Sequence, residues 1–110
     1  GNELMRKIVV LVTVGSQKEA EKIARSLVKK GLAACVNIVA GVKSIFKWKG
    51  KIETGNELLL LAKTKESRVP ELMDEVKALH SYDVPEIIAL PIVKGNKEYL
   101  KWVEDVTKEI

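Results

Sequence analysis

The sequence has few of the residues that small proteins use for cross-linking or for crossing a membrane. Cys35 is the only cysteine among 110 residues, so no disulfide can form within the chain. No stretch reaches the roughly 18 consecutive apolar residues that a membrane-spanning helix needs. Hydrophobic residues make up 46% of the chain, which is enough to form a stable core without disulfides or a structural metal. We therefore expect a cytoplasmic protein in a reducing compartment, with no membrane partner.

The sequence also lacks a block of lysine and arginine. Its formal net charge is +4 and its pI is near 9.2, but the lysines are spread over every segment and interleaved with glutamates. This pattern is typical of a solvated surface and not of a stripe that follows nucleic-acid phosphates, so we expect no nucleic-acid partner. Abundant Lys and Glu with few amide side chains are also typical of thermostable proteins.

Patterns of catalysis are missing as well. The chain has no Walker or GxGxxG motif, and its one histidine, His80, has no partner in a triad-like setting. Ser81 beside it lacks a second histidine or lysine, so we expect no catalytic residues and no enzyme. Gly15 and Ser16 before the first helix offer backbone donors, which keeps a small anionic ligand open as an alternative.

The periodicity of apolar residues predicts four strands. A β-branched run predicts a buried strand over 7–14, and a second buried strand ends at Lys63 and Thr64. Residues 32–48 alternate, with Gly41 as a bulge or bend, and a turn at 49–50 makes a long hairpin; residues 54–56 are a second candidate turn. The fourth strand is predicted over 86–93. On one face of the hairpin we expect the even-numbered Val36, Ile38, Ala40, Val42, Phe46 and Trp48.

Three helices follow from capping signals and helical spacing. Ser16 and Glu19 form a capping box before the first helix, and Gly31 ends it. Ser67 is expected to cap a second helix that ends near His80. The last helix begins at residues 95–96, and its apolar stripe contains Tyr99, Trp102, Val103, Val106 and Ile110.

This order predicts an α+β fold, the ferredoxin-like split βαβ arrangement (βαββαβ) with an extra C-terminal helix. Residues 7–110 form a single domain, and residues 1–6 are an N-terminal tail or a vector-derived remnant. Two helices on one face leave the other face of the sheet open, and the hairpin is too long for an eight-residue first strand. We therefore expect a homo-oligomer, with the open face and the hairpin as its interface.

Residues 80–91 concentrate polar chemistry between a helix and an apolar strand, where small domains often place a site. His80, Asp83 and Glu86 are candidate metal ligands, and Cys35 of another subunit is a further one. The alternative for His80 is a helix-end histidine that bonds to a carbonyl or a carboxylate. Tyr82 is expected to bury its ring at an interface.

Five separated motifs stand out along the chain: GLAACVN at 31–37, WKGKIE at 48–53, KT at 63–64, HSYDVPEI at 80–87 and YLKW at 99–102. In order and spacing they resemble the CutA family of divalent-cation tolerance proteins, over nearly the whole chain from Lys7. The resemblance implies a ferredoxin-like domain in a PII-like homotrimer and a role in tolerance of divalent cations, copper above all. It also places Tyr82, Trp48, Lys63 and Trp102 at the cleft or interface between subunits.

The enteric members of that family are proposed to bind copper through a cysteine at the end of the first strand and two consecutive histidines. Val12 and Leu79 occupy the positions of the cysteine and the first histidine here, so only His80 matches. Ser81 stands in place of the usual proline, and Asp83 in place of a common glutamate.

The resemblance therefore predicts a non-enzymatic divalent-cation tolerance or response protein that binds Cu(II), Zn(II) or another divalent metal weakly and needs no obligatory cofactor. The alternative is a PII-like trimeric scaffold or sensor for a small anionic ligand or a partner protein. Metal affinity should fall as His80 is protonated, whereas affinity for an anion should not.

Overall fold

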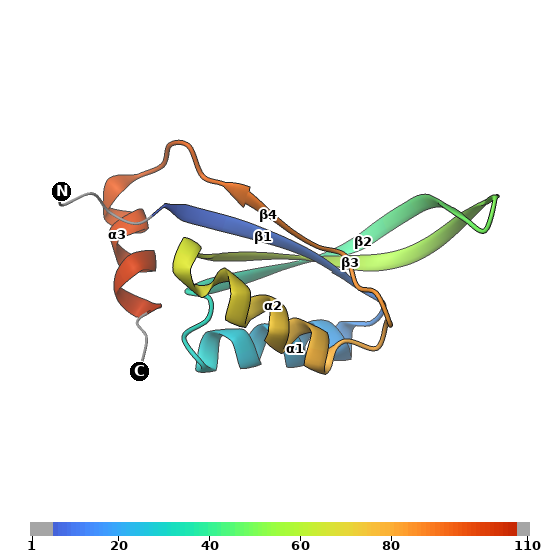
Figure 1. Ribbon diagram of the computed structural model, residues 1–110, viewed down its shortest axis with the longest axis horizontal. Helices are drawn as coiled ribbons and strands as arrows, with labels where there is room; N and C mark the ends of the chain where they lie inside the picture. The colour runs from blue at the N-terminus through green and yellow to red at the C-terminus, as the bar shows by residue number, and fades with distance from the viewer. Residues whose placement is uncertain (1–5, 108–110) are drawn as a thin grey trace.

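Four strands and three helices make up residues 6–107, which the computed structural model describes. Figure 1 shows the strands in one layer, with α1 and α2 on one side of it. The predicted α+β class and order of elements are confirmed. The elements are β1 (Lys7–Val14), α1 (Gln17–Lys29), β2 (Cys35–Trp48), β3 (Lys51–Lys65), the 3-10 turn η1 (Glu66–Arg68), α2 (Val69–Leu79), β4 (Ile87–Pro91) and α3 (Lys97–Val106). Apart from Arg6, the predicted tail lies outside the described residues, as does Ile110.

The sheet is antiparallel, with its strands in the order β2-β3-β1-β4. Because side chains alternate along a strand, even-numbered residues of β1 such as Val10 and Val12 face the helices and are completely buried. The core therefore lies between this face and the apolar stripes of α1 and α2. Its members include Ile8, Val10, Val12, Val14, Ala20, Ile23, Leu27, Leu60, Ala62, Leu72 and Val76.

The limits of α1 are those that its sequence predicts. The Oγ of Ser16 accepts a hydrogen bond from the N–H of Glu19 at 3.2 Å, which satisfies one free donor of the first turn. Gly31 follows the helix with φ +68°, a backbone conformation that glycine adopts without strain.

The start of α2 differs from the prediction. Its N-cap is Arg68 and not Ser67, and no side chain caps it. Arg68 is 5% exposed, its Nε donates to the carbonyl of Gly31 at 3.4 Å, and its guanidinium pairs with Glu71 at 3.0 Å. A tertiary contact that the local sequence does not show thus fixes where the helix begins.

The hairpin of β2 and β3 is as long as expected, with strands of 14 and 15 residues. Lys49 (φ +49°) and Gly50 (φ +78°) form its two-residue turn, the geometry that matches the twist of paired strands. Residues 54–56, the second candidate turn, stay within β3 and pair with residues 43–45.

Of the bulge or bend predicted at Gly41, the structure has the bulge, and this bulge overturns the predicted hairpin face. Val39 pairs with Leu59 but Val42 pairs with Glu57, so β2 has one extra residue here. Each later side chain therefore changes face. Phe46 and Trp48 continue the face of Val39, whereas Val36 and Ile38 point to the core.

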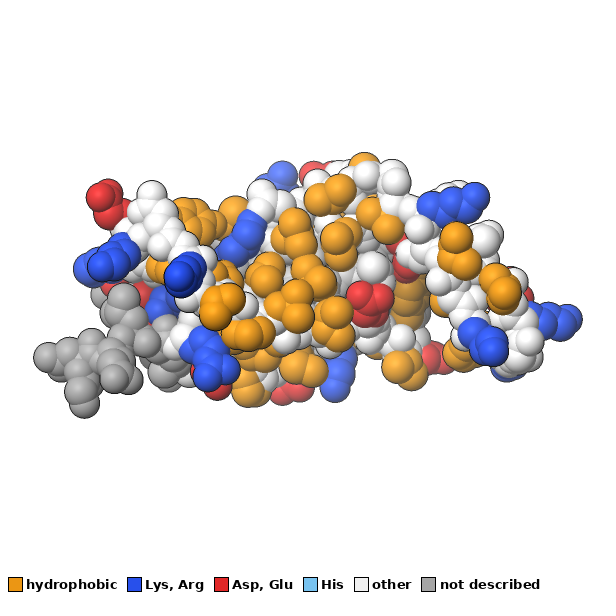
Figure 2. Space-filling view, turned by 90° about the horizontal axis from the view of Figure 1, so that it is seen from above, with side chains coloured by type: hydrophobic (Ala, Val, Ile, Leu, Met, Phe, Trp, Pro, Cys, Tyr) orange, Lys and Arg blue, Asp and Glu red, His pale blue; other side chains and the backbone are white. Residues whose placement is uncertain are grey.

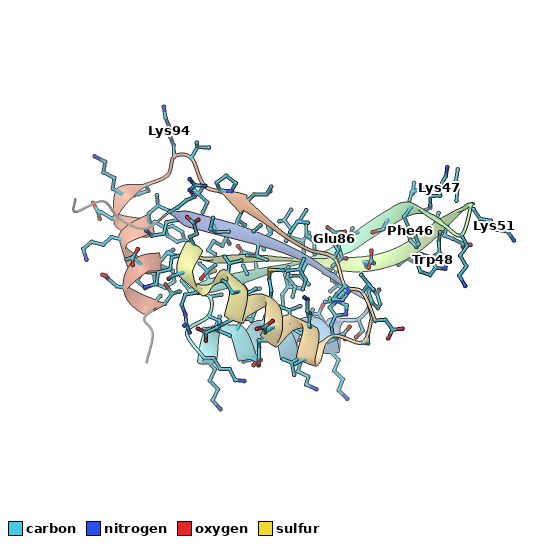
Figure 3. The ribbon with its side chains drawn as sticks, viewed as in Figure 1. Phe46, Lys47, Trp48, Lys51, Glu86 and Lys94 are labelled. Carbon is cyan, nitrogen blue, oxygen red and sulfur yellow. The ribbon has the colours of Figure 1, made fainter. Side chains whose placement is uncertain are left out.

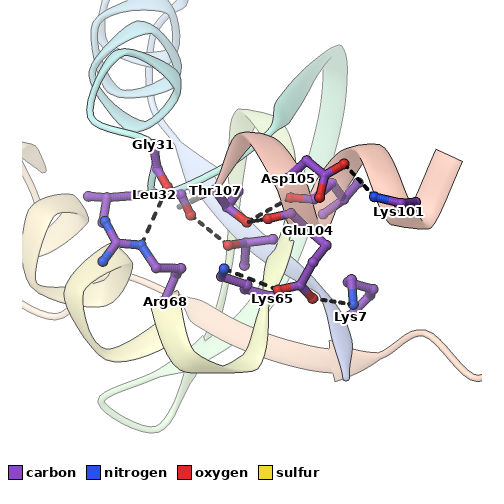
Figure 4. Close-up of polar contacts among 11 residues, drawn as sticks. Lys7, Gly31, Leu32, Lys65, Arg68, Lys101, Glu104, Asp105 and Thr107 are labelled. Carbon is purple, nitrogen blue, oxygen red and sulfur yellow. Dashed lines mark hydrogen bonds and ion pairs between the residues drawn. The ribbon is translucent and has the colours of Figure 1, made fainter. Parts of the chain in front are cut away.

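The final strand and helix lie at the edge and the end of the sheet. β4 is shorter than the predicted 86–93 and ends at Pro91. One further backbone contact follows, because the N–H of Ile92 donates to the carbonyl of Lys7 at 2.9 Å. The side chain of Asn96 caps α3 by accepting from the N–H of Glu98 at 3.0 Å. Glu104 then ties α3 to the sheet through Lys7 and Lys65 (Figure 4).

The face of the sheet opposite α1 and α2 is apolar and open. Figure 2 shows hydrophobic side chains gathered over its middle. Val39, Ile88 and Leu90 are 42%, 47% and 46% exposed there, and Leu11 and Leu61 are half-buried between them. A homo-oligomer of the predicted kind would cover this face.

Candidate functional site

The segment from His80 to Glu86 crosses from the end of α2 to the start of β4. His80 adopts an extended backbone (φ −79°, ψ +141°), and its N–H donates to the carbonyl of Val76 as the last helical hydrogen bond. The chain then passes the end of β1 and the first turn of α1, as the contacts described below show. The candidate site is therefore assembled from segments far apart in the sequence.

His80 uses both ring nitrogens within the fold. Its Nε2 lies 2.7 Å from the carbonyl oxygen of Thr13, and its Nδ1 accepts from the N–H of Tyr82 at 3.1 Å. Because a carbonyl can only accept and an N–H can only donate, these contacts require the neutral Nε2–H tautomer. This is the alternative of a helix-end histidine bound to a carbonyl. In this arrangement His80 positions the loop and has no free lone pair for a metal.

Glu19 fixes the next residue of the loop. Its carboxylate accepts from the N–H of Ser81 at 2.6 Å and from the Oγ of Ser81 at 3.1 Å. In the predicted capping box this side chain would reach back along its own helix, and it binds the loop instead. Sequence reasoning missed this role because the two residues are 62 positions apart.

Tyr82 closes the loop over the root of the hairpin. Its hydroxyl donates to the carboxylate of Glu57 at 3.0 Å, and its ring lies 4.6 Å from that of His80. Burial raises the pKa of Tyr82, and the hydrogen bond to Glu57 and the negative charges of Glu57 and Glu19 raise it further. A side chain at Gly15 would place its Cβ 3.2 Å from this hydroxyl, so glycine leaves room for the tyrosine.

A cleft of about 820 Å³ lies beside this loop. Three carboxylates and three aromatic rings contribute to its walls, and no basic side chain does. Figure 3 shows Glu86 near the root of the hairpin and Phe46 and Trp48 farther along it. The lining residues are Thr13, Ser44, Ile45, Phe46, Trp48, Glu57, Tyr82, Asp83, Val84 and Glu86.

The candidate metal ligands do not form a complete site in one copy. Among residues 6–107, no three His, Cys, Asp or Glu side chains lie close enough together to hold a metal ion. Asp83 and Glu86 line the cleft, but both nitrogens of His80 are engaged. Cys35 lies elsewhere in the sheet. It pairs with Lys63 of β3, which pairs in turn with Val9 of β1, four residues before Thr13 at the cleft.

The four residues predicted for the cleft or interface separate into two groups. Tyr82 and Trp48 line the cleft. Lys63 lies in β3 between Cys35 and Val9, and Trp102 packs near Tyr99 on α3, with ring centroids 5.6 Å apart. Trp102 is 43% exposed, so its predicted interface role depends on a second copy.

Val12 and Leu79 serve packing in this structure. Val12 is completely buried in the core, and Leu79 is half-buried against it at the end of α2. At both positions an apolar side chain therefore stands in place of a metal-binding side chain, cysteine or histidine, that the enteric copper site would require. Of the helices in the described part of the chain, none is long and apolar enough to cross a membrane.

Comparisons with known proteins agree with this architecture. The family described as "CutA1 divalent ion tolerance protein" matches residues 8–106. The divalent-cation tolerance protein CutA of Thermus thermophilus is 54% identical over 99 residues, which cover 90% of this chain and 96% of that protein. Human protein CutA is 50% identical over 99 residues, and the match spans 90% of this chain but only 55% of the human protein.

A solved structure supports the same relationship. The CutA of Archaeoglobus fulgidus, described as a periplasmic divalent cation tolerance protein, superposes with a TM-score of 0.90 at 45% identity. The superposition covers 93% of this chain and 99% of that one. The resemblance inferred from five short motifs is confirmed, and the chain belongs to the CutA1 family of divalent ion tolerance proteins.

Proposed function

We propose that this protein acts in the cellular response to divalent cations as a non-enzymatic homotrimer that binds Cu(II), Zn(II) or a similar ion weakly. The binding region is the cleft beside His80, with Asp83 and Glu86 as ligands. Membership of a family named for divalent ion tolerance supports the role. The observation that supports this binding region is the negative charge of the cleft, because its charged lining residues are Glu57, Asp83 and Glu86.

We expect weak binding because one subunit supplies too few metal ligands. First-row metals take three or four protein ligands at a high-affinity site. Asp83 and Glu86 offer two carboxylates, and Glu57 is already engaged by the hydroxyl of Tyr82. In this proposal His80 is a positioning residue that holds the loop, and a second copy completes the ligand set.

The homotrimer is supported by unpaired apolar surface. The open face of the sheet carries Ile88 and Leu90, each nearly half exposed, and the hairpin carries Phe46 and Trp48, exposed by 46% and 60%. Exposed apolar patches of this kind mark protein interfaces. A trimer similar to the PII proteins would cover the face and bring the cleft of one copy to its neighbour.

The second candidate is a PII-like scaffold or sensor. Its small-anion form is disfavoured, because three carboxylates in the cleft repel an anion. Its protein-binding form is favoured by the hairpin, which contributes to a molecule 50 Å long but only 25 and 22 Å across. We propose a cytoplasmic location for either candidate, because the one cysteine forms no disulfide.

Calorimetric titration of the reduced protein with Cu(II) and with Zn(II) tests the proposal. The amino terminus should be acetylated, since a free α-amino group binds copper itself. We expect the double variant D83N/E86Q to lose at least tenfold in affinity. The matched control D74N/E98Q removes the same charge from exposed sites outside the cleft and should bind as the parent does.

Equal affinity in all three proteins would contradict the cleft site. His80→Ala separates the two roles of the histidine. A positioning role predicts a partial loss of affinity together with a loss of stability, because the carbonyl of Thr13 and the N–H of Tyr82 lose their partner. A ligand role predicts loss of affinity with the stability unchanged.

A further inference from the structure

Another hollow of the molecule lies on the helix side of the sheet, where α1 packs against β2. Its volume is about 540 Å³, which falls within the range of small-molecule sites. Three of its lining residues are apolar, two are basic and none is acidic. We call it the α1 groove, lined by Ala24, Arg25, Val28, Lys29 and Val36.

The α1 groove has the opposite charge to the cleft beside His80. Its charged lining residues are Arg25 and Lys29, whereas three carboxylates line the cleft. A small anion is therefore repelled by the cleft and attracted by the groove. The anion alternative, which the cleft disfavours, has a place on the other side of the molecule.

The two basic side chains of the groove are poorly neutralised within the fold. They lie one helical turn apart, where like charges repel each other. Arg25 has a weak ion pair with Glu21 at 3.9 Å, and the two side chains are 82% and 47% exposed. Lys29 has no ion pair with any of residues 6–107. An anion bound between Arg25 and Lys29 would relieve their repulsion.

The apolar lining favours a ligand with an aliphatic part. Val28 is 46% exposed although it stands on a helix rich in charged residues. Ala24 is buried beside it, and Val36 is half-buried on the core side of β2. An inorganic anion would leave this apolar surface in water, whereas an alkyl chain would cover it.

The position of the groove near the end of α1 does not prevent anion binding. The C-terminal end of a helix carries about half a negative elementary charge. Here the carbonyls of Ser26, Leu27 and Val28 already accept hydrogen bonds from the N–H groups of residues 30–33. The full positive charges of Arg25 and Lys29 outweigh what remains.

The groove lies outside the surfaces that we expect to self-associate. Figure 1 shows α1 on one side of the strands, and the open apolar face is on the other side. β2 contributes only Val36, which precedes the bulge and points to the core. An oligomer that covers the open face together with Phe46 and Trp48 therefore leaves the groove in contact with solvent.

The start of α1, which the sequence offered for an anion, is less suitable. The hollow there is about 270 Å³, and the carboxylate of Glu19 lines it together with Lys18 and Lys22. The N–H of Glu19 is also occupied already, by the hydroxyl of Ser16. Its charges are mixed, whereas those of the α1 groove have one sign.

We propose that the α1 groove binds a small aliphatic carboxylate, such as the anion of a medium-chain fatty acid. Arg25 and Lys29 would bind the carboxylate through charged hydrogen bonds, while the alkyl chain lies on Ala24, Val28 and Val36. The part of α1 that lines the groove, residues 24–29, is about 7.5 Å long, which suits one short chain and not a partner helix. This site shares no residue with the cleft.

Calorimetric titration of the full chain with octanoate, below its micelle concentration, tests the inference. Acetate carries the charge without the chain and octanol carries a chain without the charge, so each should bind at least tenfold more weakly. The variant R25Q/K29Q should lower the affinity for octanoate at least tenfold, and V28S at least threefold. All three side chains are exposed, so the variants should fold as the parent does.

The matched control is K18Q/K22Q, which removes two positive charges from exposed sites of the same helix outside the groove. It should bind octanoate as the parent does. Equal loss in this control would overturn the inference, because the charge of the helix in general would then explain binding. Acetate or octanol bound as tightly as octanoate would overturn it as well, and so would the absence of octanoate binding.

Methyl NMR spectra locate the ligand. Octanoate should shift the signals of Val28 and Val36, and shifts confined to Ile88 and Leu90 would overturn the inference by placing the ligand on the open face. The peptide acetyl-alanyl-valyl-leucine offers the same chemistry at a protein terminus, and tighter binding of this peptide than of octanoate would overturn the choice of a free carboxylate.

The inference and the proposed cation site fail independently. None of these variants changes a residue of the cleft, so R25Q/K29Q should bind Cu(II) as the parent does. Loss of Cu(II) binding in R25Q/K29Q would contradict the separation of the two sites and would overturn the inference.

Discussion

At the scale of single residues, Glu104 makes the most consequential contact of the C-terminal helix. Its two carboxylate oxygens lie 2.7 Å from Nζ of Lys7 and 3.2 Å from Nζ of Lys65 (Figure 4). The side chains of the two lysines are only 4% and 11% exposed. Burial alone would raise the pKa of Glu104, but the hydrogen bonds from Lys7 and Lys65 outweigh it and hold the pKa below its usual value. One carboxylate therefore compensates two largely buried ammonium groups.

The variant E104Q should lower the free energy of unfolding by about 3 kcal/mol, because removal of one partner leaves buried charge without its counterion. Urea denaturation at pH 7 measures the change. The control E98Q removes an exposed carboxylate from the same helix and should cost less than about 0.5 kcal/mol. Equal stability of the two variants would show that the buried ion pairs contribute nothing net.

The same residue predicts a response to acid. A carboxyl whose pKa is lowered on folding stabilises the folded state fully above its unfolded pKa, and this stabilisation is lost as the pH falls through its folded pKa. Glu75, whose pKa is lowered by hydrogen bonds from Lys30 and Ser26, acts in the same direction. Urea midpoints between pH 7 and pH 2 should fall for the parent. They should fall less steeply for E104Q, because one of the two groups is gone.

At the scale of elements, the bulge of β2 decides what the hairpin presents to each side. Alternation around Gly41 predicts a single face from Val36 to Trp48, and the extra residue divides it in two. Val36 and Ile38 pack on the core, whereas Phe46 and Trp48 line the cleft. The glycine could be recognised in the sequence as a bulge or a bend. A bulge adds one residue to the strand and a bend adds none, and only the strand pairing shows which of the two is present.

The variant G41A tests the role of this glycine. Its φ of +77° disfavours any side chain, although a Cβ there would meet no atom within 4 Å. The loss should therefore come from backbone strain alone, about 1 kcal/mol or more. Urea denaturation measures it, with G55A in the facing strand as the control.

Gly55 has no positive φ, and its Cβ would reach Phe46 only at an ordinary 3.7 Å. The control should therefore be neutral or slightly stabilising, since alanine restricts the unfolded chain. Equal losses in G41A and G55A would mean that the positive φ carries no strain of its own.

At the scale of the whole molecule, the open face of the sheet predicts self-association. Leu90 in β4 pairs with Val9 on this face and is 46% exposed. Light scattering should give roughly three times the 12.2 kDa of one chain at micromolar concentration, and L90D should lower that mass, because a carboxylate cannot be buried in an apolar interface without large cost. The control V93D changes a residue that is 91% exposed beyond β4 and should keep the parent mass. A monomeric parent would contradict the prediction.

The candidate site was predictable only in part. Residues 80–86 could be picked out because one histidine, two carboxylates and a proline follow a helix end. The partners of that segment could not, since Thr13, Glu19 and Glu57 lie 67, 62 and 25 positions from the residues they bind. Long-range contacts of this kind leave no periodic trace in the sequence.

The sequence by itself determined the order of elements, the Ser16 cap, the Gly31 stop and the Lys49–Gly50 turn, because each depends on the chemistry of a few adjacent residues. It also carried the family motifs. Tertiary structure alone decided the start of α2 at the buried Arg68, the change of hairpin face at Gly41 and the engagement of both nitrogens of His80. These features depend on which distant groups meet when the core closes, and that is a property of packing and not of local sequence.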